Sequence, residues 1–100
     1  MRLAKVIGNI WATRKEDSLT GLKLLIVQPI EVDGQPSGPS LIAADRVGAG
    51  MGEKVLVVSG SSARRAAGQD GVPIDAMIVA IVDTVEWEKA MGAGRKGEPV

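Results

Sequence analysis

The sequence predicts a mainly β fold, a small five-stranded β-barrel with one short helix. Short runs rich in Val, Ile and Leu recur along the 100-residue chain, and turns rich in glycine and polar residues separate them. This is the pattern of a small all-β domain. Strand and turn alternate too quickly for β-α-β units, which need about 30 residues each. The chain length fits one domain, and the sequence contains no internal repeat.

Five apolar runs predict the strands. Gly8 lies in the middle of the first run, where we expect a bend or bulge. Pro29 marks the end of the second run or an edge position, and the centre of that run is apolar enough to be buried on both faces. The fifth run, AMIVAIV, is continuously apolar, as in a central strand. The predicted strands are residues 3–13, 22–30, 41–45, 54–58 and 76–82.

A short helix is predicted over residues 61–67. Ser61 or Ser62 can serve as its N-cap, alanines follow, and Gly68 stands where a C′ glycine belongs. A further helical turn is expected over residues 86–91. The remaining segments are rich in Gly, Pro, Ser and charged residues, which predicts turns and loops. They are residues 14–18, 31–40, 47–52 and 69–73, with a flexible tail over 92–100. Of the loops inside the domain, residues 31–40 are expected to be the most mobile.

The composition limits how the core can be built. The chain has no Phe or Tyr and has two Trp, so Val, Ile, Leu and Ala must fill the barrel. A domain of this size buries about 60–68% of the surface of its unfolded chain, and 13 glycines leave fewer side chains to bury. Both features favour oligomerisation as a source of additional burial.

The charge balance and the missing residue types exclude several classes of function. Twelve basic and twelve acidic residues give no net charge, so no long-range field favours nucleic acid or an anionic membrane. The chain has no Cys and no His, which removes thiol chemistry, the commonest general base and the commonest metal ligand. The N-terminus has no signal-peptide pattern and no run approaches the ~18 apolar residues of a membrane helix. We expect a soluble cytosolic protein.

The segment GAGMG, residues 48–52, resembles a phosphate-binding loop at first sight. A dinucleotide loop has the spacing G-x-G-x-x-G and opens a helix. Here the spacing is G-x-G-x-G, the strand KVLVV follows, and no Lys-Ser or Lys-Thr completes a P-loop. The glycines instead predict a tight corner that needs positive φ and close approach of backbones.

Residues at the predicted helix start are a second candidate site. Free amides beside Ser61 and Ser62, followed by Arg64 and Arg65, could hold an anion. Ordinary helix capping with solvated arginines is the favoured interpretation. A serine hydrolase is disfavoured because no histidine can activate the hydroxyl.

Carboxylates and tryptophans complete the candidates. Asp45, Asp75 and Asp83 lie near strand ends, where a pair could act as acid and base or bind a divalent cation. Aspartates in this position more often accept hydrogen bonds from turn amides. Trp11 and Trp87 could stack bases, but two isolated tryptophans on a neutral chain favour packing in the core or in an interface.

Four segments resemble the EutN/CcmL family of bacterial microcompartment vertex proteins. They are MRLAKVIGNIWATRK, LTGLKLLIVQPI, LIAADRVGAGMGEKVLVVSGSSAR and PIDAMIVAIVD. They occur in family order and cover about residues 1–85. The GAGMGE segment joined to VLVVSGSSAR is the most specific part. The loop 31–40 and the residues after 85 carry no resemblance.

The resemblance implies a barrel of oligonucleotide-binding-like topology that assembles as a cyclic pentamer. Such a homopentamer would cap the vertices of a polyhedral shell in the bacterial cytoplasm, with a hexameric shell protein forming the facets. It implies a vertex domain over 1–85, and a short helical turn and flexible tail over 86–100. It implies no enzyme activity, no catalytic residue, no cofactor or metal site, and no nucleic-acid or membrane partner.

Two surfaces are expected to matter for such an assembly. Gly60, Ser61 and Ser62 are the candidates for a pore at the five-fold axis, because converging helix starts give a polar, mildly positive constriction. Thr13, Arg14 and the turn are the candidates for contacts with neighbouring shell proteins or subunits. The turn residues concerned are Gly48, Ala49, Gly50, Met51 and Gly52.

Two other functions stay open on the sequence. An oligonucleotide-binding barrel that holds single-stranded nucleic acid is the alternative. A small enzyme that uses aspartates such as Asp45 beside the glycine turn is a more distant one. A discrete pentamer favours the shell protein, salt-sensitive binding of single strands favours the second function, and turnover abolished by Asp45→Asn favours the third.

Overall fold

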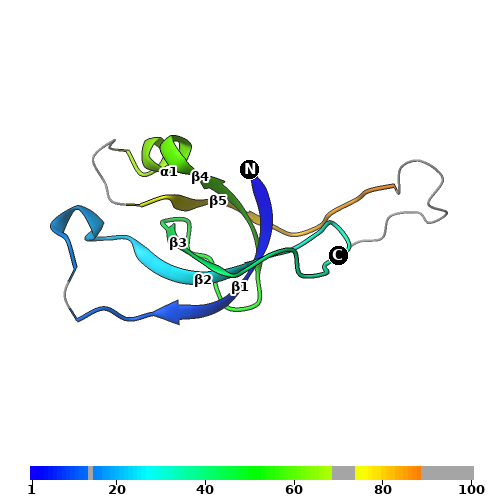
Figure 1. The fold of residues 1–100 in the computed structure, drawn as a ribbon, viewed down its shortest axis with the longest axis horizontal. Coiled ribbons are helices and arrows are strands. Elements are labelled where there is room, and N and C mark those ends of the chain that lie inside the picture. The colour runs from blue at the N-terminus through cyan, green and yellow to red at the C-terminus, as the bar shows by residue number, and fades with distance from the viewer. Residues whose placement is uncertain (14, 69–73, 89–100) are drawn as a thin grey trace.

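The predicted barrel is confirmed by the computed structural model of the chain, which describes residues 1–13, 15–68 and 74–88. Strands form a closed barrel, and the α-helix lies outside it (Figure 1). The elements of the described residues are β1 (Arg2–Ile10), the 3-10 helix η1 (Asp17–Leu19), β2 (Lys23–Pro29), β3 (Leu41–Asp45), β4 (Lys54–Ser59), α1 (Gly60–Ala66) and β5 (Ala76–Val82).

The strands follow one another around the barrel in the order β1-β2-β3-β5-β4. All neighbours are antiparallel except β3 and β5, which pair in parallel at Ala44↔Met77 and Asp45↔Ile78. Closure removes the unpaired strand edges that an open sheet would expose. The irregularity predicted at Gly8 is confirmed, because the pairing of β1 with β2 shifts register between Val6 and Gly8.

Alternate residues of the strands face inward and form the barrel core. Its members are small and aliphatic, as the lack of Phe and Tyr requires. Leu25 and Val27 of β2 and Ile78 of β5 are among its largest side chains. The buried core residues are Ala4, Val6, Leu25, Val27, Ala43, Ala49, Val55, Val57, Ala76 and Ile78.

A second apolar cluster lies between the barrel and α1. Ala63 and Ala67 are buried against Met77, Ala44 and Leu22. The helix therefore covers the outside of the barrel beside β4 and β5, as Figure 1 shows. Its alanines let the helix approach the strands closely.

The helix begins one residue beyond β4, and the predicted N-cap is wrong. Ser59 is the N-cap, neither Ser61 nor Ser62, and its side chain makes no capping hydrogen bond. The reason is that β4 runs straight into α1. The Gly60 amide donates to the Asp75 carbonyl oxygen at 2.9 Å, and a φ of 62° at Gly60 turns the chain into the helix. The predicted C′ glycine is confirmed, because Gly68 has a φ of 93°.

The loop over residues 31–40 is held by more hydrogen bonds than its composition suggests. The Gln28 side chain donates to the Gly38 carbonyl oxygen at 2.9 Å, and Arg2 donates to the Ser37 carbonyl oxygen at 3.0 Å. The Ser37 amide of the loop donates to the carbonyl oxygen of Pro29, the last residue of β2, at 2.8 Å. These contacts join the loop to β1 and β2, and its being the most mobile segment stays a prediction.

The remaining expectations fall at the chain end and in one turn. Residues 86–88 are not helical, so the part of the expected helical turn that the structure describes is wrong. Residues 89–91, the turn 69–73 and the tail 92–100 lie outside the described residues. The chain after β5 runs away from the barrel in Figure 1. Within the described ranges, no helix has the length and apolar character needed to cross a membrane.

Shortening a core side chain is expected to destabilise the barrel. Leu25→Ala should lower the free energy of unfolding by about 2–5 kcal/mol, because it removes a buried side chain and leaves a cavity. Val32→Ala, in the exposed loop, is the control and should change it by less than about 0.5 kcal/mol. Urea denaturation of both variants in the same oligomeric state measures this, and equal losses would contradict the assignment of the core.

Candidate functional site

A corner of the chain, residues 47–53, joins β3 to β4, and we call it the glycine corner. Asp45, the last residue of β3, is 1% exposed. Its Oδ1 accepts a hydrogen bond from the Val47 amide at 3.1 Å, and its Oδ2 accepts one from the Ala49 amide at 2.9 Å. The favoured interpretation of Asp45, as an acceptor for turn amides, is therefore confirmed.

The end of the glycine corner, Gly52 and Glu53, is hydrogen-bonded to β1. The Val6 amide donates to the Glu53 carbonyl oxygen, and the Gly52 amide donates to the Val6 carbonyl oxygen, both at 2.9 Å. The Glu53 side chain accepts from the Gly50 amide at 2.6 Å. Ala49 is buried in the barrel core, so the corner is part of the barrel. The sequence interpretation missed Glu53, whose signal is its place three residues after Gly50.

The glycines of the corner are explained by backbone conformation. Gly48 and Gly52 have φ values of 87° and 82°, a region that only glycine adopts at no steric cost. A Cβ at either position would meet no atom within 4 Å. The predicted positive φ is confirmed at these two residues, whereas the predicted close backbone approach is not found among the residues that the structure describes. Gly50 lies outside the left-handed region, and a Cβ there would lie 3.3 Å from Glu53 Oε1.

Two exposed side chains of the glycine corner are apolar. Met51 is 60% exposed, and Val47 is exposed too. Thr13, the other contact candidate, is exposed beyond the end of β1, whereas the corner pairs with Val6 in the middle of that strand. Seven residues of extended chain span roughly 20 Å, so the structure does not bring Thr13 to the corner. Arg14 lies outside the described residues.

The pore candidates lie together at the start of α1. Ser61 and Ser62 are exposed, and Gly60 is half-buried. The anion-site hypothesis is weakened, because Arg64 Nη1 donates to the Ile74 carbonyl oxygen at 3.4 Å and is thus partly engaged. Arg65 is exposed.

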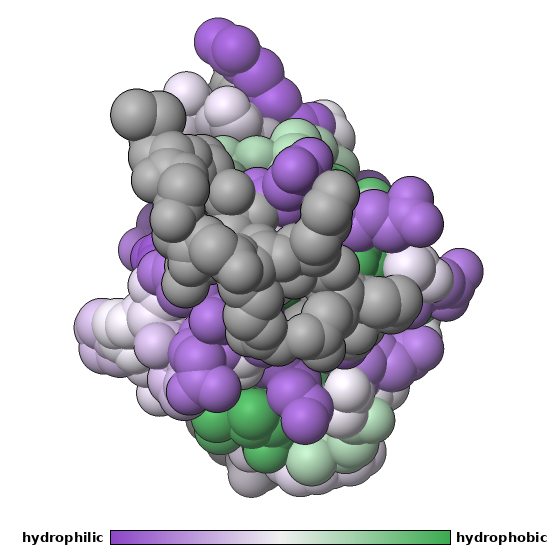
Figure 2. Space-filling model, turned by 90° about the vertical axis from the view of Figure 1, so that its right-hand side faces the viewer, coloured by the Kyte–Doolittle hydropathy of each residue, from purple (hydrophilic) through white to green (hydrophobic). Residues whose placement is uncertain are grey.

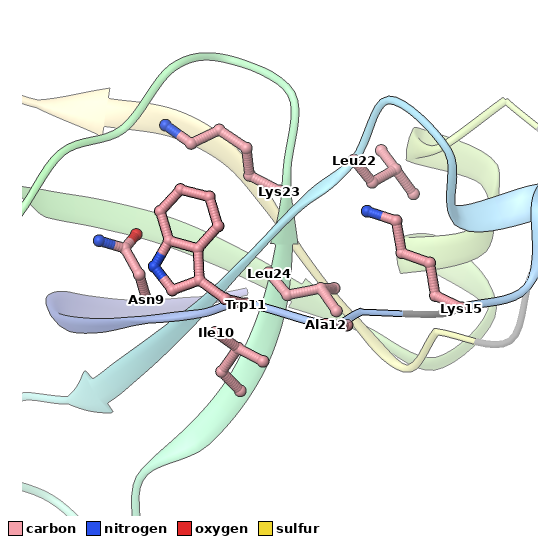
Figure 3. Close-up of a pocket in the computed structure, with 8 residues that line it drawn as sticks. All are labelled: Asn9, Ile10, Trp11, Ala12, Lys15, Leu22, Lys23 and Leu24. Atoms are coloured by element: carbon pink, nitrogen blue, oxygen red, sulfur yellow. The ribbon is translucent and has the colours of Figure 1, made fainter.

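Trp11 is 92% exposed, so core packing is the wrong interpretation for this side chain. Figure 3 shows it beside a shallow hollow of about 170 Å³. In that view the indole lies between Asn9 and Lys23, with Lys15 at the other end of the hollow. Trp87 is half-buried.

A larger apolar surface lies on the outside of β1, β2 and β3, and we call it the apolar sheet face. Leu24 and Ile26 must point outward, because Leu25 and Val27 between and beside them are in the core. Register partners share a face, which places Ile10 beside Leu24 and Ile42 beside Ile26. The apolar sheet face consists of Ile10, Leu24, Ile26 and Ile42.

The apolar sheet face is partly open to solvent, because Ile42 is exposed whereas Ile10, Leu24 and Ile26 are half-buried. Ile42 is 50% exposed, and a hollow of about 180 Å³ extends from Leu24 and Ile42 to Ile74. Gly8 makes room for Ile26, whose Cδ1 would lie 3.1 Å from a Cβ at Gly8. The sequence feature that indicated this face was the continuous apolar run of the second strand, which predicted that the strand is buried on both faces. Figure 2 views the molecule from the right-hand side of Figure 1. Unlike the apolar sheet face, most of the coloured surface in this view is hydrophilic, and apolar atoms are seen at its lower edge.

Among the described residues, the candidate aspartates are not brought together into a cluster that could act as acid and base or bind a metal ion. The Asp45 carboxylate is occupied by two amides, while Asp75 and Asp83 are exposed. No group of three or more Asp, Glu, His or Cys side chains in the described ranges could hold a metal ion.

Comparison with known proteins identifies the family. The family model described as "Ethanolamine utilisation protein EutN/carboxysome" matches residues 1–83. The chain belongs to the EutN/CcmL family. The match covers every strand of the barrel, the glycine corner and α1.

Two of the three similar proteins described next, CcmL and GrpN, are shell proteins by name. The carboxysome shell vertex protein CcmL of Synechocystis is 51% identical over 85 residues, which are 85% of each chain. A solved structure of the ethanolamine utilization protein EutN has a TM-score of 0.82 at 46% identity, covering 85% of this chain and 88% of that one. GrpN of Rhodospirillum rubrum, titled a pentameric microcompartment shell protein, has a TM-score of 0.76 at 48% identity, covering 86% and 98%.

Substitution of the corner glycines by alanine distinguishes strain at a positive φ from a steric clash of the added Cβ atom. Gly48→Ala should lower the free energy of unfolding by about 1–2 kcal/mol, because alanine is strained at positive φ. Gly50→Ala is the matched control and should cost less than about 1 kcal/mol, since only the end of the Glu53 side chain must move. Denaturant titration measures both. A larger loss for Gly50→Ala would contradict the conformational explanation.

Proposed function

We propose that this chain is a structural shell protein, not an enzyme, and that its homopentamer caps a vertex of a bacterial microcompartment shell. The observation that carries the proposal is the similarity to GrpN, a protein titled pentameric, at 48% identity across the whole barrel. The identity of 51% to a carboxysome shell vertex protein supports the same role. The protein would then reside in the bacterial cytoplasm, within the shell.

The apolar sheet face supports self-association. A barrel with a small aliphatic core gains stability when such a face is covered, at about 25 cal/mol per Å² of apolar area. A cyclic pentamer needs two different faces of the same chain to meet. The apolar sheet face is our candidate for one of them, and Trp11, which borders it beside Ile10 and Leu24, extends it. A net charge of zero limits repulsion where five copies converge.

The partners beyond the pentamer are the hexameric proteins of the shell facets. We infer that Thr13, Arg14 and the glycine corner contact them or a neighbouring subunit. Exposure of Thr13, Met51 and Val47 supports this inference. Residues 1–85 are proposed as the vertex domain and 86–100 as a tail, a division supported by the family match over 1–83.

The barrel offers one feature that favours the alternative function. Trp11 beside Lys15 and Lys23 is a suitable place for a base to stack near a phosphate. The names of the relatives favour the shell role instead. Binding of single-stranded nucleic acid that weakens with salt would support the alternative.

Native mass spectrometry tests self-association. The chain should form a species of about 52 kDa, five times the 10.4 kDa of one chain. Ile42→Asp should shift it towards the monomer, because the charge would be buried in the interface. Val32→Asp is the control, since Val32 is similarly exposed, at 44%, but lies in the loop 31–40. A wild-type monomer would contradict the proposed function.

The pore hypothesis is tested with single cysteines, because the chain has none of its own. If Gly60, Ser61 and Ser62 surround the five-fold axis, Ser61→Cys side chains of adjacent subunits should form disulfides under mild oxidation. Ser40→Cys, exposed in another part of the chain, should give little cross-linking. Denaturing gel electrophoresis measures the dimer fraction. If both variants cross-link equally little, Ser61 does not line a pore.

A further inference from the structure

We propose that Asp45 is the positioning residue of the glycine corner. Its buried carboxylate holds the Val47 and Ala49 amides, and so positions the segment that presents Val47 and Met51 to a hexameric protein of the shell facets. The inference rests on the proposed vertex function and adds to it the residue that shapes the contact.

The buried carboxylate is more than a space-filling group. A carboxyl group with 1% exposure loses its hydration, and hydrogen bonds must compensate for that loss. Both oxygens of Asp45 receive them from backbone amides of the corner itself. An apolar side chain would fill the same space without desolvating a charge. What the carboxylate adds is direction, because two amides two residues apart must converge on it.

Four amides of the corner donate hydrogen bonds to the rest of the barrel or to the corner itself, and two of its apolar side chains, those of Val47 and Met51, stay exposed. Asp45 holds the first two amides, Glu53 holds the third, and β1 holds the fourth. These amides belong to Val47, Ala49, Gly50 and Gly52. Burial of the Ala49 methyl group in the core fixes the middle of the segment. Val47 and Met51, on either side of it, project into solvent.

A fixed corner suits a contact surface. A segment with glycines at 48, 50 and 52 has high conformational entropy when nothing holds it. Ordering it only upon docking would weaken the complex. The Asp45 hydrogen bonds order the segment in the free subunit, so Val47 and Met51 meet the partner without that loss.

Hydrogen exchange of the pentamer tests the positioning role. In Asp45→Asn the side-chain NH2 group must face one of the two corner amides. The amides of Val47 and Ala49 should then exchange about tenfold faster or more, the order expected when one charge-assisted bond is lost. The amide of Ile78 in β5 should change little. Asp83→Asn, an exposed aspartate just after β5, is the matched control and should leave every one of these rates unchanged.

The same variants are then tested for docking. Co-production with a hexameric microcompartment shell protein should recover several-fold less Asp45→Asn than wild type in the shell fraction, with Asp83→Asn recovered at the wild-type level. A uniform rise in exchange across the corner and Ile78 would mean that Asp45 only stabilises the barrel, and would overturn the inference. Equal recovery of Asp45→Asn and wild type would overturn it as well.

A second variant keeps the test decisive if Asp45→Asn does not fold. Glu53 is exposed, and Glu53→Ala removes only the side-chain bond to the Gly50 amide. It should speed exchange at Gly50 and lower recovery with the hexameric protein, and unchanged recovery despite faster exchange would contradict the need for a fixed corner. Failure of the vertex function itself shows differently, as a wild-type chain that neither forms a pentamer nor enters the shell fraction.

Discussion

Closure of the barrel depends on a short parallel contact between β3 and β5, and Asp45 forms one of its two register pairs. The backbone of Asp45 is in register with Ile78 of β5 on one side and with Lys23 of β2 on the other. Its side chain holds the glycine corner that leads into β4. One residue thus links the pairing that closes the barrel to the turn that carries its exposed apolar corner.

The barrel that results is stable through small aliphatic contacts and leaves apolar surface outside. The inward residues of β2 fill the core, while Leu24 and Ile26 of the same strand lie on its outer face, half-buried, beside the exposed Ile42. Contiguous apolar surface on a soluble protein marks a place of contact. The helix covers part of the outer surface, and the proposed pentamer would place further copies of the chain on the rest.

The sequence predicted what depends on local pattern and missed what depends on partners distant along the chain. The five strands, the bulge at Gly8 and the C′ glycine at Gly68 follow from periodicity and glycine chemistry, and all were found. The N-cap was misplaced because the Gly60 amide pairs with Asp75, fifteen positions away. The hydrogen bonds that hold the loop 31–40 were not predicted, because their donors, Gln28 and Arg2, lie outside the loop.

The candidate contact surfaces were likewise predicted where they depend on local sequence and missed where they depend on distant partners. The glycine corner was recognised from its motif, but the parts played by Glu53 and Val6 appear only when the corner folds back on β1. Exposure of Trp11 could not be read from the sequence either, because an aromatic residue after a strand suits a core as well as an interface.

Electron cryo-microscopy of shells gives the most direct test of the vertex role. Shells would be produced from hexameric facet proteins with and without this chain. With the chain present, closed polyhedra should show density at each five-fold vertex that fits five copies of the barrel, and without it the vertices should be vacant or the shells open. Closed shells with vacant vertices in the presence of the chain, or the chain found only in the lumen, would contradict the vertex role.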